Sequence, residues 1–98
     1  MNHKSEKIRL HAIVRGTVQG VGFRMFVVDV AQRLSLTGWV RNRWDDTVEV
    51  TAEGEKPGLE ALVEALSRGP RMAAVDKVDV EWLPATGEYK QFWITQMY

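Results

Sequence analysis

The sequence predicts an α+β domain whose elements run in the order β-α-β-β-α-β. Apolar residues recur at every second position in several segments, as in half-buried strands, and at helical intervals of three and four in two others. The chain has 98 residues, a length typical of one compact domain with one hydrophobic core. We therefore expect a single domain over residues 8–98, preceded by a flexible N-terminal tail over residues 1–7.

The first strand, the loop after it and the first helix are each marked by a change of pattern. Apolar and polar side chains alternate over residues 8–15, which predicts a strand. Residues 16–22 contain three glycines, so we expect a loop rather than the interior of a helix or strand. From Phe23 to Leu34 the apolar residues follow helical spacing, which predicts an amphipathic helix.

The remaining elements complete the pattern. Three further segments alternate as strands do and cover residues 37–43, 48–53 and 78–82. Between the last two of these, a helix is expected to start near Pro57 and to end at Gly69. A short C-terminal strand is expected within residues 92–97. This order is that of the ferredoxin-like sandwich, a mostly antiparallel sheet with two helices on one face.

The composition excludes several kinds of site. There is no cysteine, so disulfides, thiolate nucleophiles and cysteine-ligated metals are ruled out. The two histidines, His3 and His11, are too few for a histidine metal cage. No apolar stretch approaches the roughly 20 residues of a membrane span, and no apolar signal core follows the first residues. We therefore expect a cytoplasmic protein that has no membrane partner.

The formal net charge of zero conceals an uneven distribution along the chain. Residues 1–44 carry eight basic and two acidic side chains, whereas residues 45–98 carry five basic and eleven acidic ones. A basic half is consistent with an anionic partner, and equally with a dipolar surface that only faces solvent. Charge alone does not choose between these two interpretations.

The glycine-rich loop is the first candidate site. It leaves a strand and opens a helix, so its N–H groups and the positive end of the helix dipole could bind a phosphate-like anion. Arg24, in the first turn of the predicted helix, would add a planar set of donors suited to phosphate oxygens. The loop lacks the Walker pattern and the glycine spacing of dinucleotide sites. A tight strand-to-helix turn beside an exposed arginine is the alternative explanation.

Asn42 is the second candidate. In a right-handed β-α-β unit the two strands run parallel, so their C-terminal ends lie at the same end of the sheet. Asn42, near the end of the second strand, is therefore expected beside the loop that leaves the first strand. There it could orient a water molecule toward a bound phosphoryl group. The alternative is an amide side chain that hydrogen-bonds its own hairpin.

Together these two segments resemble the signatures of the acylphosphatase family. The run from Gly16 to Arg24, Gly-Thr-Val-Gln-Gly-Val-Gly-Phe-Arg, is similar to the first signature at every specified position. The run Gly-Trp-Val-Arg-Asn that ends at Asn42 is similar to the second, with Val48 and Gly54 at its later positions. The element order and the closing Phe-x-Ile segment are also similar, so the resemblance covers nearly the whole domain.

The resemblance implies hydrolysis of acyl phosphates, which are carboxyl-phosphate anhydrides, to a carboxylate and inorganic phosphate without metal, cofactor or phosphoenzyme. It implies that Arg24 holds the phosphoryl oxygens and that Asn42 positions the attacking water. The backbone N–H groups that would bind the substrate phosphate belong to Gly16, Thr17, Val18, Gln19, Gly20 and Val21. The partner would be a small-molecule acyl phosphate, and a monomer is the simplest expectation.

One residue departs from the family pattern. The hairpin glycine four residues after the asparagine is Asp46 in this chain. If the turn requires a positive φ at this point, aspartate adopts it more readily than most residues, but at some cost in stability. Nearby, Arg41 and Arg43 could attract anions through their field without touching them.

Two other functions are left open. The same fold carries RNA-recognition domains, but the strand over residues 48–53 has two acidic residues and no aromatic one, so no nucleic-acid partner is expected. The closer alternative is a non-catalytic acylphosphatase-like domain that binds a ligand, as in larger carbamoyl-transfer proteins. The stand-alone length and the presence of both Arg24 and Asn42 argue against that alternative.

Overall fold

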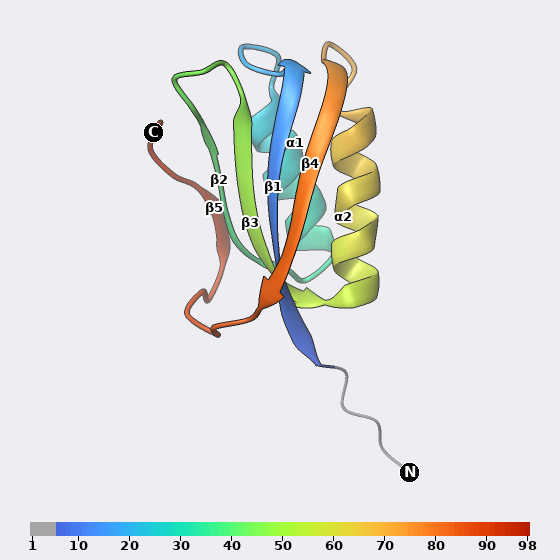
Figure 1. Cartoon of the computed structure of the whole chain (residues 1–98), viewed down its shortest axis with the longest axis vertical. Helices are drawn as coiled ribbons and strands as arrows, with labels where there is room; N and C mark the ends of the chain where they lie inside the picture. The colour runs from blue at the N-terminus through green and yellow to red at the C-terminus, as the bar shows by residue number, and fades with distance from the viewer. Residues whose placement is uncertain (1–5) are drawn as a thin grey trace.

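A computed structural model describes residues 6–98 as a five-stranded sheet covered on one face by two helices (Figure 1). The elements in chain order are β1 (Lys7–Thr17), α1 (Phe23–Arg33), β2 (Thr37–Asn42), β3 (Val48–Glu55), α2 (Lys56–Arg68), β4 (Ala74–Pro84) and β5 (Phe92–Ile94). The predicted ferredoxin-like order and the short C-terminal strand are confirmed. The expected tail over residues 1–7 lies mostly outside the described residues, and β1 already includes its last member.

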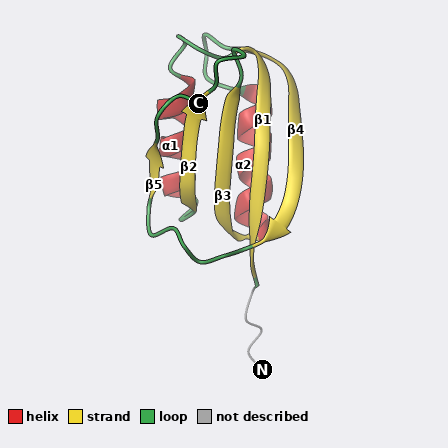
Figure 2. Cartoon of the chain, turned by 60° about the vertical axis from the view of Figure 1, so that its left-hand side comes forward, coloured by secondary structure: helices red, strands yellow, loops and turns green. Residues whose placement is uncertain are grey.

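The sheet order brings the C-terminal ends of β1 and β2 to one end of the molecule. The strands lie in the order β4-β1-β3-β2-β5. Both β1 and β2 pair antiparallel to β3, so they run parallel to each other, and β5 pairs parallel to β2. The β1–α1 loop and the β2–β3 hairpin therefore lie at the same end, uppermost in Figures 1 and 2. We call this end of the sheet, with residues 18–22 and 42–47, the loop end.

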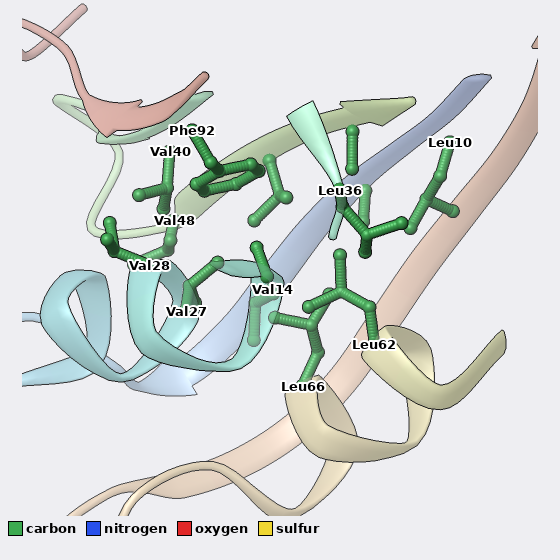
Figure 3. Packing of buried hydrophobic residues seen from close by; sticks show 14 of the residues in the cluster. Leu10, Val14, Val27, Val28, Leu36, Val40, Val48, Leu62, Leu66 and Phe92 are labelled. Atoms are coloured by element: carbon green, nitrogen blue, oxygen red, sulfur yellow. The ribbon is translucent and has the colours of Figure 1, made fainter. Parts of the chain in front are cut away.

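Both helices bury one face against the sheet. The strands contribute alternate side chains to this core, and the helices contribute residues at helical spacing (Figure 3). Side chains with no exposed surface include Leu10, Val14, Val27, Val40, Leu62 and Leu66. The predicted helical faces are thus the buried ones. Neither helix of residues 6–98 has the length and apolar character of a membrane span.

The opposite face of the sheet, which we call the open face, carries ion pairs. They include Arg9–Glu53 at 2.7 Å, Arg41–Glu49 at 2.7 Å and Arg15–Asp79 at 2.9 Å. Each of these pairs joins a basic residue of the N-terminal half to an acidic residue of the C-terminal half. The charge asymmetry of the sequence is therefore offset across neighbouring strands in the folded protein.

Glu49 is the centre of one cluster on the open face. Its carboxylate accepts from Nε of Arg41 and lies 2.7 Å from Nε2 of His11. Burial alone would raise the pKa of Glu49, but the contacts with His11 and Arg41 outweigh it and hold the pKa below its ordinary value of 4.5. The Arg41 guanidinium also lies 4.6 Å from the ring centre of Trp39 and 4.2 Å from that of Tyr98. Arg41 is therefore committed to contacts within the protein.

The loop after β1 is shorter than the sequence predicts. Gly16 and Thr17 continue β1 beyond a bulge and pair with β4. Gly16 has a φ of +130°, and a Cβ there would overlap the carbonyl group of Ala74, so only glycine permits this close approach of β4. The expectation that residues 16–22 all form a loop is wrong for the first two, and the loop proper covers residues 18–22.

Candidate active site

The loop over residues 18–22 is anchored by its valines and exposed at its glycines. Val18 is buried in the core, Val21 packs against it, and Gly20 and Gly22 lie at the surface. The two glycines adopt φ angles of +74° and +76°, which side chains with a Cβ rarely allow. A Cβ at either position would meet no atom of the described residues within 4 Å. Backbone conformation, and not crowding, therefore requires these glycines, and the loop is open to an incoming ligand.

The N–H groups at this point lack acceptors within the described protein. Helix α1 begins directly after the loop, without a side-chain cap and without an acidic residue in its first turn. Of the backbone hydrogen bonds outside the helices and strands in residues 6–98, none is donated by residues 18–22. Unpaired donors at the positive end of a helix dipole form a suitable site for an anion.

Arg24 lies in the first turn of α1, next to these donors, and its side chain is exposed. In the described part of the chain, the arginines that form ion pairs are Arg9, Arg15, Arg41, Arg43 and Arg68. Arg24 is not among them, so its guanidinium is available to an anion bound at the loop. It borders a hollow of about 140 Å³ whose lining is Gly20, Gly22, Phe23, Arg24, Met25 and Ile94.

Gln19 ties the loop to the β2–β3 hairpin. Its side-chain Nε2 donates to the carbonyl oxygens of Arg43 and Thr47, at 2.8 and 2.9 Å. The sequence predicted a role for the backbone of Gln19 only, and not this side-chain contact. It fixes the loop over residues 18–22 relative to the strand end that carries Asn42.

Asn42 is the last residue of β2, and its side chain is half-buried. Because side chains alternate along a strand, Asn42 points to the same face as the buried Val40, which is the face that α1 covers. Its carbonyl oxygen accepts from the N–H of Tyr98 at 3.0 Å. The side-chain bonds of the hairpin within residues 6–98 come from Gln19 and Asp45, and none involves the Asn42 amide. Within these residues, the Asn42 amide therefore does not form the hydrogen bond to its own hairpin that the alternative explanation required.

The two aspartates of the hairpin shape its turn. Oδ1 of Asp45 accepts from the hydroxyl of Thr47 at 2.5 Å and from its N–H at 3.2 Å. The hydroxyl bond is the main reason that the pKa of Asp45 lies below its ordinary value of 3.8. Asp46 has a φ of +70°, so the turn does require a positive φ where the family pattern has glycine. Both aspartates therefore contribute to the turn, Asp45 through its hydrogen bonds and Asp46 through its backbone conformation.

The structure thus brings the glycine loop, Arg24 and Asn42 to the loop end, as the sequence analysis predicted. It places Arg41 on the open face instead, in an ion pair. No signal in the sequence could have assigned the Gln19 side chain or Tyr98 to this region, because both contacts depend on pairing between distant segments. Within residues 6–98, no group of three or more acidic or histidine residues is arranged to hold a metal ion.

The fold and the loop end define a class of protein, a ferredoxin-like sandwich in which the N–H donors between β1 and α1 have no acceptor among residues 6–98. The acylphosphatase family model matches residues 10–94. The chain is 56% identical to an acylphosphatase of Pseudomonas paraeruginosa over 81 residues, which cover 83% of this chain and 89% of that protein. It matches the structure of an acylphosphatase from Bacillus subtilis with a TM-score of 0.87 and 39% identity, over 90% of this chain and 98% of that one.

A larger protein contains a similar domain. Full-length HypF, in its phosphate- and nucleotide-bound form, matches 99% of this chain with a TM-score of 0.88 and 29% identity, but only 13% of HypF is covered. The relatives named acylphosphatase are instead covered over most of their own length. The chain belongs to the acylphosphatase family. This membership supports acyl-phosphate hydrolysis as its activity.

Proposed function

We propose that the loop N–H groups and Arg24 hold the phosphoryl group of an acyl phosphate, and that Asn42 orients the attacking water. One observation carries the proposal. Helix α1 begins with neither a capping side chain nor an acidic residue, beside an arginine that has no carboxylate partner in the described range. Donors that have no acceptor within residues 6–98 suit the peripheral oxygens of a phosphoryl group.

The cradle would consist of the N–H groups of residues 18–22 and the guanidinium of Arg24. The resemblance also assigns Gly16 and Thr17 to phosphate binding; they lie in β1 and lead the chain into this loop. In phosphoryl transfer, charge is spread over the equatorial oxygens in the transition state. Donors that are already in place stabilise that charge without reorganisation, which is how such a site would lower the barrier.

Asn42 would act on the water and not on the anion. The water oxygen forms a bond to phosphorus while the bond from phosphorus to the bridging oxygen breaks, and the bonding electron pair leaves with the carboxylate. Both water protons remain on the inorganic phosphate that forms. The conjugate acid of the leaving carboxylate has a pKa of about 4, so the reaction requires no general acid. An alkyl phosphate would expel a far more basic alkoxide, and it should therefore be a poor substrate.

We further propose that the protein is a monomeric cytoplasmic enzyme that uses no metal or cofactor. Its partner is a small-molecule acyl phosphate. Nucleic acid is not proposed as a partner, because Arg9 and Arg41 on the open face are already bound to Glu53 and Glu49. Size-exclusion chromatography tests the monomeric state, and a filter-binding assay with labelled single-stranded RNA tests whether the protein binds nucleic acid.

The proposal is tested by phosphate release from acetyl phosphate and benzoyl phosphate in the presence of a chelator, with glycerol phosphate as the monoester. We expect turnover of both acyl phosphates and none of the monoester. Arg24→Gln should abolish turnover, whereas Arg33→Gln, the same change at the other end of α1, should have no effect. A protein that binds phosphate but releases none from either acyl phosphate would be the non-catalytic domain instead.

A further inference from the structure

Two exposed apolar side chains line the same hollow as Arg24. The side chains of Met25 and Ile94 are 55% and 38% exposed, and both line the hollow together with Gly20 and Gly22. On the premise of the function proposed above, we propose that this hollow binds the acyl group of the substrate and that Ile94 and Met25 favour apolar acyl groups over small polar ones.

The position of Ile94 in β5 supports this assignment. Phe92 and Ile94 are two residues apart, so they face the same side of the sheet. Phe92 is 3% exposed beneath α1, whereas Ile94 is 38% exposed. Ile94 is the register partner of Val40, two residues before Asn42 on that same side. The apolar row of the core therefore continues to the surface beside the proposed water-orienting residue.

The geometry of an acyl phosphate requires a neighbouring acyl site. A single oxygen joins the phosphorus to the acyl carbon, so a phosphoryl group on the loop holds its acyl group within a few ångströms of Arg24. The hollow of about 140 Å³ begins there, because its lining includes both Arg24 and the two loop glycines. Its other lining residues are Phe23, Met25 and Ile94, all apolar. A phenyl or branched alkyl group would bury apolar surface against them, whereas a methyl or amino group would bury little.

The test compares kcat/KM for benzoyl phosphate and acetyl phosphate in Ile94→Thr and Met25→Gln. Threonine keeps the branched shape that suits a strand, and glutamine keeps the length and helical preference of methionine. The matched control is Met72→Gln, at an exposed methionine in the turn before β4. Thermal melting shows whether each variant remains folded.

We expect the benzoyl-to-acetyl ratio of kcat/KM to fall about 3- to 10-fold in Ile94→Thr and in Met25→Gln, and to stay unchanged in Met72→Gln. An unchanged ratio in both folded variants, or an equal loss on both substrates, would overturn the inference while leaving the proposed function intact. If the unmodified protein hydrolyses neither substrate, the proposed function fails and this inference fails with it.

Discussion

Arg24 and Arg41 lie in the two signature segments of this chain, but the fold gives them opposite surroundings. Arg41 on the open face donates to Glu49 at 2.7 Å, and its guanidinium lies over the rings of Trp39 and Tyr98. Arg24 at the loop end is exposed, and no carboxylate of the described residues pairs with it.

The difference shows how one residue type serves two purposes. On the open face, strand pairing places Arg41 directly opposite Glu49 in the sheet register. At the loop end, α1 has no acidic side chain in its first turn, so its own first turn supplies no carboxylate to neutralise the donors gathered there. We infer that changes at the loop end affect activity most, and that changes on the open face affect stability most.

The largest expected effect is that of Arg24→Gln. Loss of the guanidinium should lower kcat/KM at least about 10³-fold and weaken binding of inorganic phosphate, with little change in Tm. Arg24→Lys should also have a low kcat/KM, because a point charge replaces the planar donors.

In contrast, Arg41→Gln should retain much of the activity but lower stability by about 1–3 kcal/mol, since it removes a partner of the buried Glu49. Enzyme kinetics and urea unfolding of all three variants would check this; equal kinetic losses at both arginines would contradict the contrast.

Asn42→Ala should produce the next largest effect. Without an oriented water, kcat should fall about 10²-fold, whereas the inhibition constant of inorganic phosphate should stay nearly the same. This division distinguishes a residue that acts on water from one that holds the anion. It would be refuted by an Asn42→Ala protein that loses phosphate affinity to the same extent as Arg24→Gln.

Gln19→Leu should separate the loop from the hairpin. The carbonyl groups of Arg43 and Thr47 lose a donor, so we expect about 1–2 kcal/mol of destabilisation in urea unfolding. Because the loop and Asn42 are then less firmly positioned, kcat should fall about 10-fold. Gln91→Leu, an exposed glutamine outside the loop end, is the control and should change neither quantity. Full kcat in a measurably destabilised Gln19→Leu protein would show that the tie serves stability alone.

The open face should make stability depend on pH. Burial alone would raise the pKa of Glu53, but N–H donors from Thr86 and Gly87 and the ion pair with Arg9 lower it below its ordinary value of 4.5. A carboxyl group whose pKa is lower in the folded state than in the unfolded state stabilises the fold when ionised. This contribution is complete above about pH 5 and is lost as the pH falls through the lowered value.

Urea unfolding from pH 7 down to pH 3 measures this dependence. In the unmodified protein, the urea concentration at half-unfolding should decrease once the pH is below about 4.5. In Glu53→Gln it should vary less with pH. Glu60→Gln, at an exposed position of α2, should behave like the unmodified protein. A midpoint that is as pH-dependent in Glu53→Gln as in the unmodified chain would exclude this carboxylate as a cause.

The smallest effect is expected at Asp46. Its φ of +70° is costly for a residue with a Cβ, so Asp46→Gly should raise stability by about 0.5–1 kcal/mol and leave activity unchanged. Asp46→Ala should lower stability, since alanine tolerates this conformation less well than aspartate. The melting temperatures of both variants are compared with that of the unmodified protein. A Tm of Asp46→Gly below that of the unmodified protein would be evidence against strain at this position.

Much of the fold could be predicted from the sequence because its signals are local. Alternation and helical spacing are set by neighbours in the chain, and they predicted every strand and both helices. The exception is the start of the loop. Gly16 was expected there because of its residue type, but close pairing with β4, some 60 residues away, keeps it in β1. No local pattern records such a contact.

The candidate site, like the fold, could be predicted only in part from the sequence. Arg24 and Asn42 could be predicted because the order of elements places them at one end of the sheet and because both lie in segments that resemble the acylphosphatase signatures. The tie through Gln19, the bond from Tyr98 to Asn42 and the exposure of Ile94 depend on how distant segments pack. The sequence also could not show that Arg41 is neutralised, since its partner is defined only by the register of β2 with β3.

The central claim, that the loop N–H groups and Arg24 form a phosphate cradle, is tested most directly by a titration with inorganic phosphate followed in ¹H–¹⁵N NMR spectra. We predict saturable shifts that are largest for the N–H groups of residues 18–24, preserved in Asn42→Ala and lost in Arg24→Gln. Shifts confined to other parts of the chain, or equal shifts in the protein that lacks the Arg24 guanidinium, would contradict the account.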